Sequence, residues 1–218
     1  EYCDLLITGS GPSGLASAYA AAKNGARVIL AEDKPRFGGS LLTSDVNIGN
    51  QTGVEWTEKI IAELKSMPNV TVKNRSQVFG YYDHNMLVMS ERISDHLPKT
   101  QKYLPKQRLW YIRANEVLIS SGSIERPLVF GNNDTPGVML SSAAKEYMKV
   151  YGVLVGKKPL IFTNNDSGYE TAIEFKKNGV NPIILDTRSK PSSDIITEAK
   201  DLNIEIKFSY VVVAAKGY

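Results

Sequence analysis

The sequence has few of the residues that cross-link small proteins or bind metals. Its 218 residues include one cysteine, Cys3, and two histidines, His84 and His96. One cysteine cannot form an intramolecular disulfide, so we expect a reducing compartment, with the cytoplasm as the default. A metal site built from several histidines or from a cysteine cluster is excluded. We expect His84 at a hairpin tip and His96 in a polar loop, neither of them catalytic.

Long apolar runs and an excess of one charge are also absent. No apolar stretch reaches the roughly 18 to 20 residues of a membrane-spanning helix, and the first residues lack the pattern of a secretion signal. The net charge is only +3 and no basic block stands out, so neither a membrane nor nucleic acid is an expected partner. Apolar residues make up 42% of the chain, which suits one full domain and part of another. Because a strand-like run follows Glu1 almost at once, we expect part of a longer protein.

The amino-terminal region carries the strongest local signal. An apolar run from Cys3 to Thr8 precedes a glycine-rich loop, a helix-compatible segment follows from Leu15 to Lys23, and a second strand is expected from Arg27 to Ala31. The loop between the first strand and the helix reads Gly9-Ser10-Gly11-Pro12-Ser13-Gly14. In such a βαβ unit the first glycine permits a tight turn, the second lets backbone approach a pyrophosphate, and the third brings the helix against the strand. The helix N-terminus then offers N–H groups to phosphates, which predicts a dinucleotide site.

Acidic and glycine residues after the second strand extend this predicted site. Glu32 stands 18 residues after Gly14 and is followed by Asp33. A carboxylate at this position accepts hydrogen bonds from a ribose diol and repels a 2′-phosphate, which favours NAD or FAD over NADP. The next segment, Arg36-Phe37-Gly38-Gly39-Ser40, resembles the arginine and double-glycine segment of two-dinucleotide flavoproteins, in which the glycines approach the pyrophosphate from the other side.

The middle of the chain excludes one redox chemistry and predicts a mixed sheet. Leu41 to Asn50 contains no cysteine pair, so dithiol reduction beside a flavin is excluded. Thr52 and Glu55 form a capping-box pattern before an amphipathic helix. We expect a third parallel strand and then an antiparallel meander around the polar loop Ser94 to Lys106. These strands are Asn69–Lys73 for the parallel sheet and Gln77–Tyr82, Asn85–Arg92 and Gln107–Arg113 for the meander.

A short separate strand, Val117 to Ile119, is expected to return to the parallel sheet. It ends at Ser120-Ser121-Gly122, where flavoproteins of this architecture often have Ala-Thr-Gly beside the cofactor. We therefore include Ser121 and Gly122 among the candidate cofactor-binding residues, together with Val78 of the first meander strand. We identify no catalytic residue.

A second βαβ pattern repeats the first without its phosphate loop. A strand from Pro159 to Thr163, a helix from about Ser167 to Lys177 and a strand from Pro182 to Leu185 ending on Asp186 are expected, followed by a helix Ser193–Leu202 and a strand Ile204–Phe208. Aligning the two Lys-Asn-Gly segments places Gly168 on Gly14 and Asp186 on Glu32. Gly9 then becomes Thr163 and Gly11 becomes Asn165, while Asp166 is expected to cap the helix. Nucleotide binding by this second unit is therefore not expected.

Five motifs together point to one known family. They are Phe79 to Met86, Gln107 to Trp110, Ser121 to Phe130, Asn133 to Met139 and the loop Thr163 to Ser167. These motifs resemble those of the large alpha subunit of heterotetrameric sarcosine oxidase. The resemblance implies a subunit of an oxidoreductase acting on CH–NH groups, which demethylates sarcosine to glycine and passes the one-carbon unit to folate. It also implies beta, gamma and delta partner subunits, NAD in this chain, FMN at the alpha–beta interface and FAD in the beta subunit. Alone, the chain would be inactive.

The resulting prediction is an α/β Rossmann-like FAD/NAD(P)-binding fold with a parallel sheet and an antiparallel β-meander, followed by a truncated second unit. The predicted domains are residues 1–156 and 157–218. By the resemblance Gly9, Gly11, Gly14 and Glu32 would hold NAD, helped by Arg36, Gly39 and Ser40. Two alternatives stay open: a self-sufficient FAD-dependent amine or amino-acid oxidoreductase, and a non-catalytic dinucleotide-binding scaffold.

Overall fold

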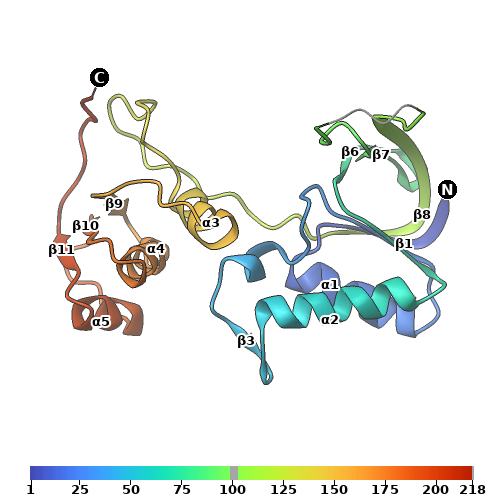
Figure 1. Ribbon diagram of the computed structural model, residues 1–218, viewed down its shortest axis with the longest axis horizontal. Coiled ribbons are helices and arrows are strands. Elements are labelled where there is room, and N and C mark those ends of the chain that lie inside the picture. Colours follow the sequence, from blue (N-terminus) through green and yellow to red (C-terminus); the bar gives the residue numbers. More distant parts are fainter. Residues whose placement is uncertain (99–102, 218) are drawn as a thin grey trace. The chain divides into compact units, whose positions relative to one another are not determined.

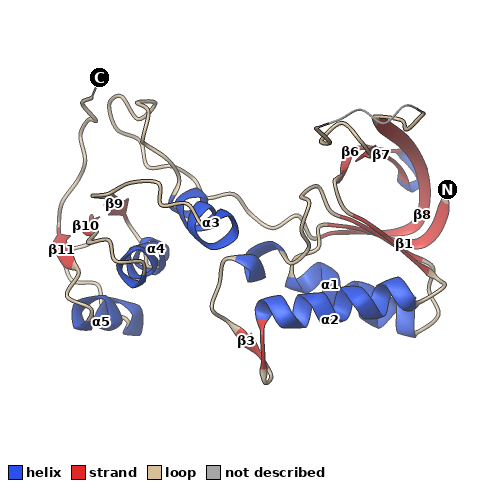
Figure 2. Ribbon diagram, viewed as in Figure 1, coloured by secondary structure: helices blue, strands red, loops and turns tan. Residues whose placement is uncertain are grey.

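The structure is a computed structural model that describes residues 1–98 and 103–217. Figures 1 and 2 show its helices and strands, which belong to two compact units, Glu1–Ser123 and Ile124–Tyr218. The predicted polar loop Ser94 to Lys106 lies partly outside the described residues. Among the described residues no helix is long and apolar enough to cross a membrane.

One six-stranded sheet forms the frame of the first unit, with strand order β5-β2-β1-β8-β7-β6. Its strands are β1 (Tyr2–Thr8), β2 (Val28–Ala31), β5 (Val70–Lys73), β6 (Ser76–Tyr82), β7 (Met86–Arg92) and β8 (Gln107–Ile119). β5, β2, β1 and the second half of β8 run parallel, whereas β6, β7 and the first half of β8 are antiparallel. The carboxyl ends of β1, β2 and β8 therefore meet at one edge, where ligands bind in open α/β sheets.

Two helices cover one face of this sheet. In Figure 1, α1 (Pro12–Lys23) and α2 (Gly53–Ser66) lie side by side. Their apolar positions, among them Leu15 and Leu64, are buried with Val28 and Leu30 of β2. The shorter elements are the 3₁₀ helices η1 (Gly39–Leu42) and η2 (Asp83–Asn85) and the two-stranded hairpin β3 (Asn47–Ile48) and β4 (Gln51–Thr52).

β8 corrects one sequence prediction. Gln107–Arg113 and Val117–Ile119 are not separate strands but parts of one strand, because the polar residues between them continue the pairing. Pairing with β7 stops at the first residue of that strand, where Met86 lies opposite Arg113. From there β1 pairs with β8 on the other side, from the pair of Tyr2 and Arg113 to that of Thr8 and Ile119. One strand thus joins the meander to the parallel sheet.

The predicted capping box of α2 is present. Thr52 Oγ1 accepts from the Glu55 backbone N–H at 3.2 Å, and Glu55 Oε2 accepts from the Thr52 backbone N–H at 2.8 Å. Because Thr52→Ala leaves the Glu55 N–H without this acceptor, we expect it to lower the free energy of unfolding by about 1 kcal/mol. Urea denaturation measures this change. Thr52→Ser keeps the hydroxyl and should restore the stability, and an equal loss in both variants would contradict the capping role.

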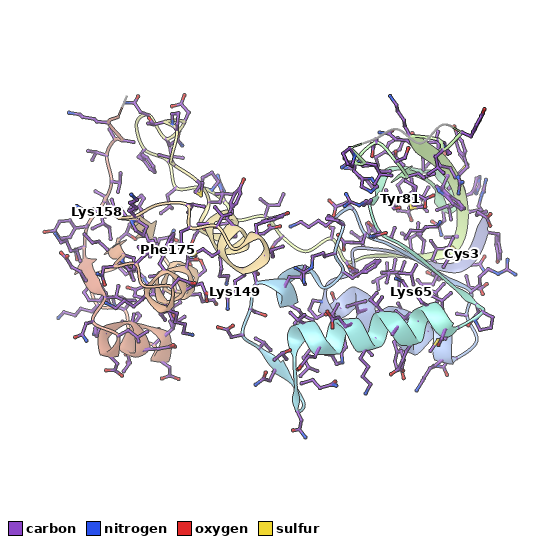
Figure 3. The ribbon with its side chains drawn as sticks, in the orientation of Figure 1. Cys3, Lys65, Tyr81, Lys149, Lys158 and Phe175 are labelled. Atoms are coloured by element: carbon purple, nitrogen blue, oxygen red, sulfur yellow. The ribbon has the colours of Figure 1, made fainter. Side chains whose placement is uncertain are left out.

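Cys3 lies in the core on the other face of the sheet. It is fully buried among Leu6, Ile29, Met89 and Ile112, and Figure 3 labels it on β1. Burial raises the pKa of its thiol to about 11, with Asp4 adding to the effect. Since the thiolate is the reactive form, Cys3 serves as a packing residue.

The second unit has a three-stranded parallel sheet in the order β11-β10-β9. Its elements are α3 (Ser141–Tyr151), β9 (Leu160–Thr163), α4 (Ser167–Lys177), β10 (Ile183–Asp186), α5 (Asp194–Asp201) and β11 (Glu205–Phe208). Phe175 of α4, labelled in Figure 3, is buried in the core with Tyr169, Ile184 and Ile196. The sequence placed the elements from β9 to β11 within one or two residues of their observed bounds, but it did not predict α3.

Helix α3 packs with this second unit. Ala144 and Met148 of α3 are buried in the same core as Phe175. Lys149 of α3, labelled in Figure 3, lies 3.0 Å from a carboxylate oxygen of Glu174 on α4. The sequence-based boundary after residue 156 therefore falls later than the division of the compact units after Ser123.

Candidate dinucleotide-binding site

The first glycine loop joins β1 to α1 at the carboxyl edge of the parallel strands. Gly9 has φ +100°, and the backbone carbonyl of Ser120 fills the space that a side chain on Gly9 would need. Gly14 packs in the same way against the carbonyl oxygen of Gly9. Gly11 differs, because a Cβ there would have nothing within 4 Å. Gly9 and Gly14 thus allow backbone segments to pack closely, whereas Gly11 leaves open space above the loop.

The first turn of α1 faces this open space. Gly11 is its N-cap, Pro12 lies at its first position, and no acidic residue stands in its first turn. Pro12 has no N–H, and the first-turn N–H groups of Ser13 and Gly14 have no helical carbonyl to bind. Such a helix end, with its positive dipole and no side-chain cap among the described residues, suits an anion.

The double-glycine segment packs directly against the first loop. A Cβ on Gly39, whose φ is +53°, would lie 2.9 Å from Gly11 Cα. Gly38 is buried and donates its N–H to the carbonyl oxygen of Ser10 at 3.1 Å. Arg36, Gly39 and Ser40 are exposed. The two glycine segments, remote in sequence, are thereby brought together at one place.

Glu32 lies beneath these two loops and is 6% exposed. Its Oε2 accepts from Ser10 N and Ser10 Oγ at 2.9 and 2.5 Å, and its Oε1 accepts from Lys34 N at 3.0 Å. Burial raises the pKa of Glu32 and the neighbouring Asp33 carboxyl adds to this, although the Ser10 and Lys34 hydrogen bonds oppose it. A ligand hydroxyl donating to Glu32 would favour the ionised carboxylate.

The remaining predicted residues lie at different distances from this loop. The Ser120–Ser121 backbone touches Gly9, so the end of β8 lies beside the first glycine loop. Ser121 and Gly122 are exposed just beyond it. Val78 is different, because its partly buried side chain packs against the core cluster of Cys3 and Met89.

The corresponding place in the second unit is filled by the protein itself. Asp186, the counterpart of Glu32, is fully buried, and its Oδ2 accepts from Tyr169 Oη at 2.7 Å. The Arg188 guanidinium donates to both oxygens of Asp186, at 2.8 Å in the shortest contact, and lies 2.8 Å from Asp166 Oδ1. Burial alone would raise the pKa of Asp186, but the hydrogen bonds from Arg188 and Tyr169 outweigh it and lower that pKa.

The loop before α4 corrects the predicted role of Asp166. Asp166 stands at the N-cap position, but its side chain makes no cap hydrogen bond and pairs with Arg188 instead. The cap comes from Asn165, whose Oδ1 accepts from Ser167 N and Ser167 Oγ at 2.9 and 2.7 Å. Thr163 Oγ1 closes the loop by donating to the Asn165 carbonyl. Side chains therefore occupy the loop and helix end that the first unit leaves open.

No candidate metal site exists among the described residues. They include no group of three or more His, Cys, Asp or Glu side chains that could hold an ion. His84 lies in the exposed turn η2 with φ 58°, and His96 is exposed beside Asp95. The open loop, free helix N-terminus and adjacent carboxylate of the first unit instead suit the pyrophosphate and ribose of a dinucleotide.

Comparisons with known sequences find a matching family model and several similar proteins. The sequence model of the family described as FAD dependent oxidoreductase matches residues 4–100. The sarcosine oxidase alpha subunit of Rhizobium meliloti (strain 1021) is 43% identical over 91% of this chain, and that of Corynebacterium sp. (strain P-1) is 36% identical over 97%. The alpha subunit from Corynebacterium sp. (strain U-96) is 36% identical over 88% of the chain, which covers 20% of its length.

Solved structures of low identity share the fold. L-proline dehydrogenase from P. horikoshii has a TM-score of 0.69 at 21% identity, with 89% of this chain and 37% of that chain covered. T. acidophilum thioredoxin reductase has a TM-score of 0.71 at 17% identity, with coverages of 100% and 67%. These likenesses confirm the predicted Rossmann-like fold.

The first two of these sarcosine oxidase subunits are likewise much longer than this chain, which covers 20% and 22% of their lengths. The resemblance predicted from the motifs is nevertheless confirmed over almost all of this chain. By sequence the chain is thus similar, over nine tenths of its length, to about one fifth of the alpha subunit of sarcosine oxidase, and its fold is Rossmann-like.

Proposed function

We propose that the chain is the dinucleotide-binding part of the alpha subunit of a sarcosine oxidase and that its first unit binds NAD. The observation that carries this proposal is the open loop at Gly11, which lies beside a free helix N-terminus and the buried carboxylate of Glu32. The similarity to alpha subunits supports the choice of enzyme. The similarity covers nearly all of the chain and includes both units.

In this proposal the residues of the chain bind and orient the nucleotide. Gly11 and the N–H groups of Ser13 and Gly14 lie against the pyrophosphate, with Gly39 and Ser40 on its other side and Arg36 near its charge. Glu32, with Asp33 beside it, accepts from the adenosine ribose, while Ser121 and Gly122 border the site at the end of β8. No residue here is assigned a bond-making role, and the chain alone is expected to be inactive.

The wider assembly is part of the same proposal. The full enzyme would demethylate sarcosine oxidatively to glycine in the cytoplasm and transfer the one-carbon unit to folate. Beta, gamma and delta subunits would be its partners, with FAD in beta and FMN at an interface that this chain supports. Flavin when bound supplies the two-electron oxidation of the amine.

Identification of the released nucleotide tests the NAD assignment. The purified chain is expected to be nearly colourless and to release NAD in stoichiometric amount on denaturation, as measured by chromatography and mass spectrometry. If the nucleotide is lost on purification, NAD at a hundredfold excess over its dissociation constant should add about 2.7 kcal/mol to the free energy of unfolding. Release of stoichiometric FAD would overturn the assignment of NAD.

A FAD-dependent amine or amino-acid oxidoreductase is the second candidate. The match to the FAD dependent oxidoreductase family over residues 4–100 favours it, because this region contains both glycine segments and Glu32. It requires a yellow protein whose flavin absorbance bleaches when an amine substrate is added without oxygen. A colourless protein, or a yellow one that no amine bleaches, would contradict it.

A non-catalytic scaffold is the third candidate, and the filled loop of the second unit favours it. With Arg188 and Asn165 occupying that loop, the second unit offers no open phosphate site among its described residues. A nucleotide in the first unit would then stabilise the fold only. Stabilisation by ADP as large as that by NAD would support this role, whereas no stabilisation by NAD, FAD or ADP would exclude it.

A further inference from the structure

The serine between the first two glycines of the loop does not point its hydroxyl toward open space. Ser10 is fully buried, and its Oγ donates to Glu32 Oε2 at 2.5 Å. The same Oγ accepts from Gly38 N at 3.3 Å. One buried hydroxyl therefore connects the first glycine loop, the carboxylate at the end of β2 and the double-glycine segment.

The hydrogen bonds around Glu32 leave it little accepting capacity. A carboxylate has about four lone-pair sites. Two at Oε2 are taken by Ser10 N and Ser10 Oγ, and one at Oε1 is taken by Lys34 N. Among the hydrogen bonds of the described residues, one acceptor site therefore remains, on Oε1. The neighbouring Asp33 carboxyl, which is exposed, is the other acidic group beside it.

We infer that Ser10 is a positioning residue that holds Oε2 of Glu32 and directs the remaining acceptor of Oε1 to a single hydroxyl of the adenosine ribose. This inference rests on the proposed function, since it assumes a dinucleotide in the first unit. It goes further in assigning the Ser10 hydroxyl to the carboxylate and not to the phosphates. It also limits Glu32 to one ribose hydroxyl, although the ribose offers two.

Removal of this hydroxyl should leave the fold intact. In Ser10→Ala, Glu32 keeps its bonds from the backbone N–H groups of Ser10 and Lys34, and Gly38 N keeps the Ser10 carbonyl at 3.1 Å. What changes is the orientation of the carboxylate, which loses its shortest hydrogen bond. Circular dichroism checks the fold. Ser10→Cys, which is of similar size and a weak donor, provides a second variant for the same measurements.

Calorimetric titration with ADP and its deoxy analogues tests the inference. For the unsubstituted chain, removing both ribose hydroxyls in 2′,3′-dideoxy-ADP should weaken binding about 10- to 100-fold, the range for a hydrogen bond to a charged group. Of 2′-deoxy-ADP and 3′-deoxy-ADP, one should account for nearly all of this loss and the other for little. Equal, large losses with both would contradict the single acceptor.

The variants separate positioning from loop structure. In Ser10→Ala the preference for ADP over dideoxy-ADP should shrink to less than about threefold, while dideoxy-ADP binds as before. Ser66→Ala, at the exposed last residue of α2, should keep the full preference. Glu32→Gln should lose it, and adding Ser10→Ala to Glu32→Gln should cause no further loss.

Two other results would overturn the inference. If Ser10→Ala weakens ADP and dideoxy-ADP equally, Ser10 shapes the loop without acting through Glu32. If both Ser10 variants keep the preference of the unsubstituted chain, Ser10 does not position the carboxylate. Failure of the unsubstituted chain to bind ADP or NAD contradicts the proposed function itself, which distinguishes it from these outcomes.

Discussion

Replacing Gly14 with alanine is expected to destabilise the first unit by more than about 3 kcal/mol. A Cβ on Gly14 would overlap the carbonyl oxygen of Gly9 and lie 3.3 Å from Ser120 Cβ. The main obstacle is backbone at the point where β1, β8 and α1 meet, so no side-chain rotation relieves it. Overpacking of this kind costs about 1 to 3 kcal/mol where side chains can adjust, and more where they cannot. Urea denaturation, followed by circular dichroism, measures the change.

Gly11→Ala is the matched control for this substitution. Its Cβ would meet nothing within 4 Å, and Gly11 has φ −65°, which any residue adopts. We therefore expect stability within about 0.5 kcal/mol of the original. Dinucleotide affinity should fall about 100-fold or more, because the methyl group enters the space through which a pyrophosphate reaches the backbone. Equal stability of the two variants would contradict the packing role of Gly14, and full affinity in Gly11→Ala would contradict the site.

The fold was largely predictable because its signals are local. The glycine spacing, the Thr52–Glu55 box and the change from helical to alternating periodicity each lie within a few residues of the element they specify. The register of the second βαβ unit followed from its Lys-Asn-Gly segment. In both units the asparagine N–H closes the helix, and the following glycine has a positive φ, +86° at Gly25 and +78° at Gly179.

The continuity of β8 was not predictable from such local signals. The residues from Arg113 to Glu116 look like a break because they are mostly polar. They remain a strand because β1 pairs with them where the pairing with β7 stops, with Tyr2 opposite Arg113 and Leu5 opposite Glu116. This pairing joins residues more than a hundred positions apart. Tertiary contacts therefore override the local preference at this point.

The hydrogen bonds between side chains of the candidate site were also not predictable from the sequence. The pattern predicted Glu32 and the glycines, but not that Ser10 Oγ bonds Glu32 or that Gly38 packs beside it. These contacts depend on how three loops fold over one another. In the second unit, Arg188 two positions after Asp186 was the available signal, since its backbone N–H binds Asp186 as that of Lys34 binds Glu32.

Arg188→Met is expected to lower the stability of the second unit by about 2 to 4 kcal/mol at neutral pH. Asp186 is fully buried, and Arg188 supplies the cation that balances its charge. Loss of one partner of a buried ion pair costs about 3 to 5 kcal/mol, and the expected value is lower because the Arg188 side chain is 31% exposed. The double variant Asp186→Asn with Arg188→Met removes the orphaned charge and should recover most of the stability.

The pH dependence of this loss identifies the ion pair as its cause. In the unsubstituted chain Arg188 and Tyr169 hold the pKa of Asp186 below its ordinary value of about 3.9. Stabilisation by the ionised carboxylate is therefore complete above that value and disappears as the pH falls through the lowered pKa. In Arg188→Met the cation no longer opposes the effect of burial on Asp186. The pKa of Asp186 should therefore rise, and this variant should gain stability as the pH falls from neutral. The difference in the free energy of unfolding between the unsubstituted chain and Arg188→Met should thus narrow toward low pH. The double variant, which has no carboxylate at position 186, should not show this gain in stability on acidification.

A constant gap at all pH values would mean that Arg188 acts by packing alone. If the stability difference narrows toward low pH, the Arg188 cation balances the charge of Asp186, the residue that corresponds to Glu32 of the first unit. In the first unit the described residues that donate to the counterpart Glu32 are Ser10 and the backbone N–H of Lys34, and neither donor group is a cation. This difference between the two carboxylates favours the first unit as the place where the dinucleotide binds. The second unit satisfies its carboxylate and its helix N-terminus with its own side chains, and the first leaves an acceptor and a helix end available for a ligand.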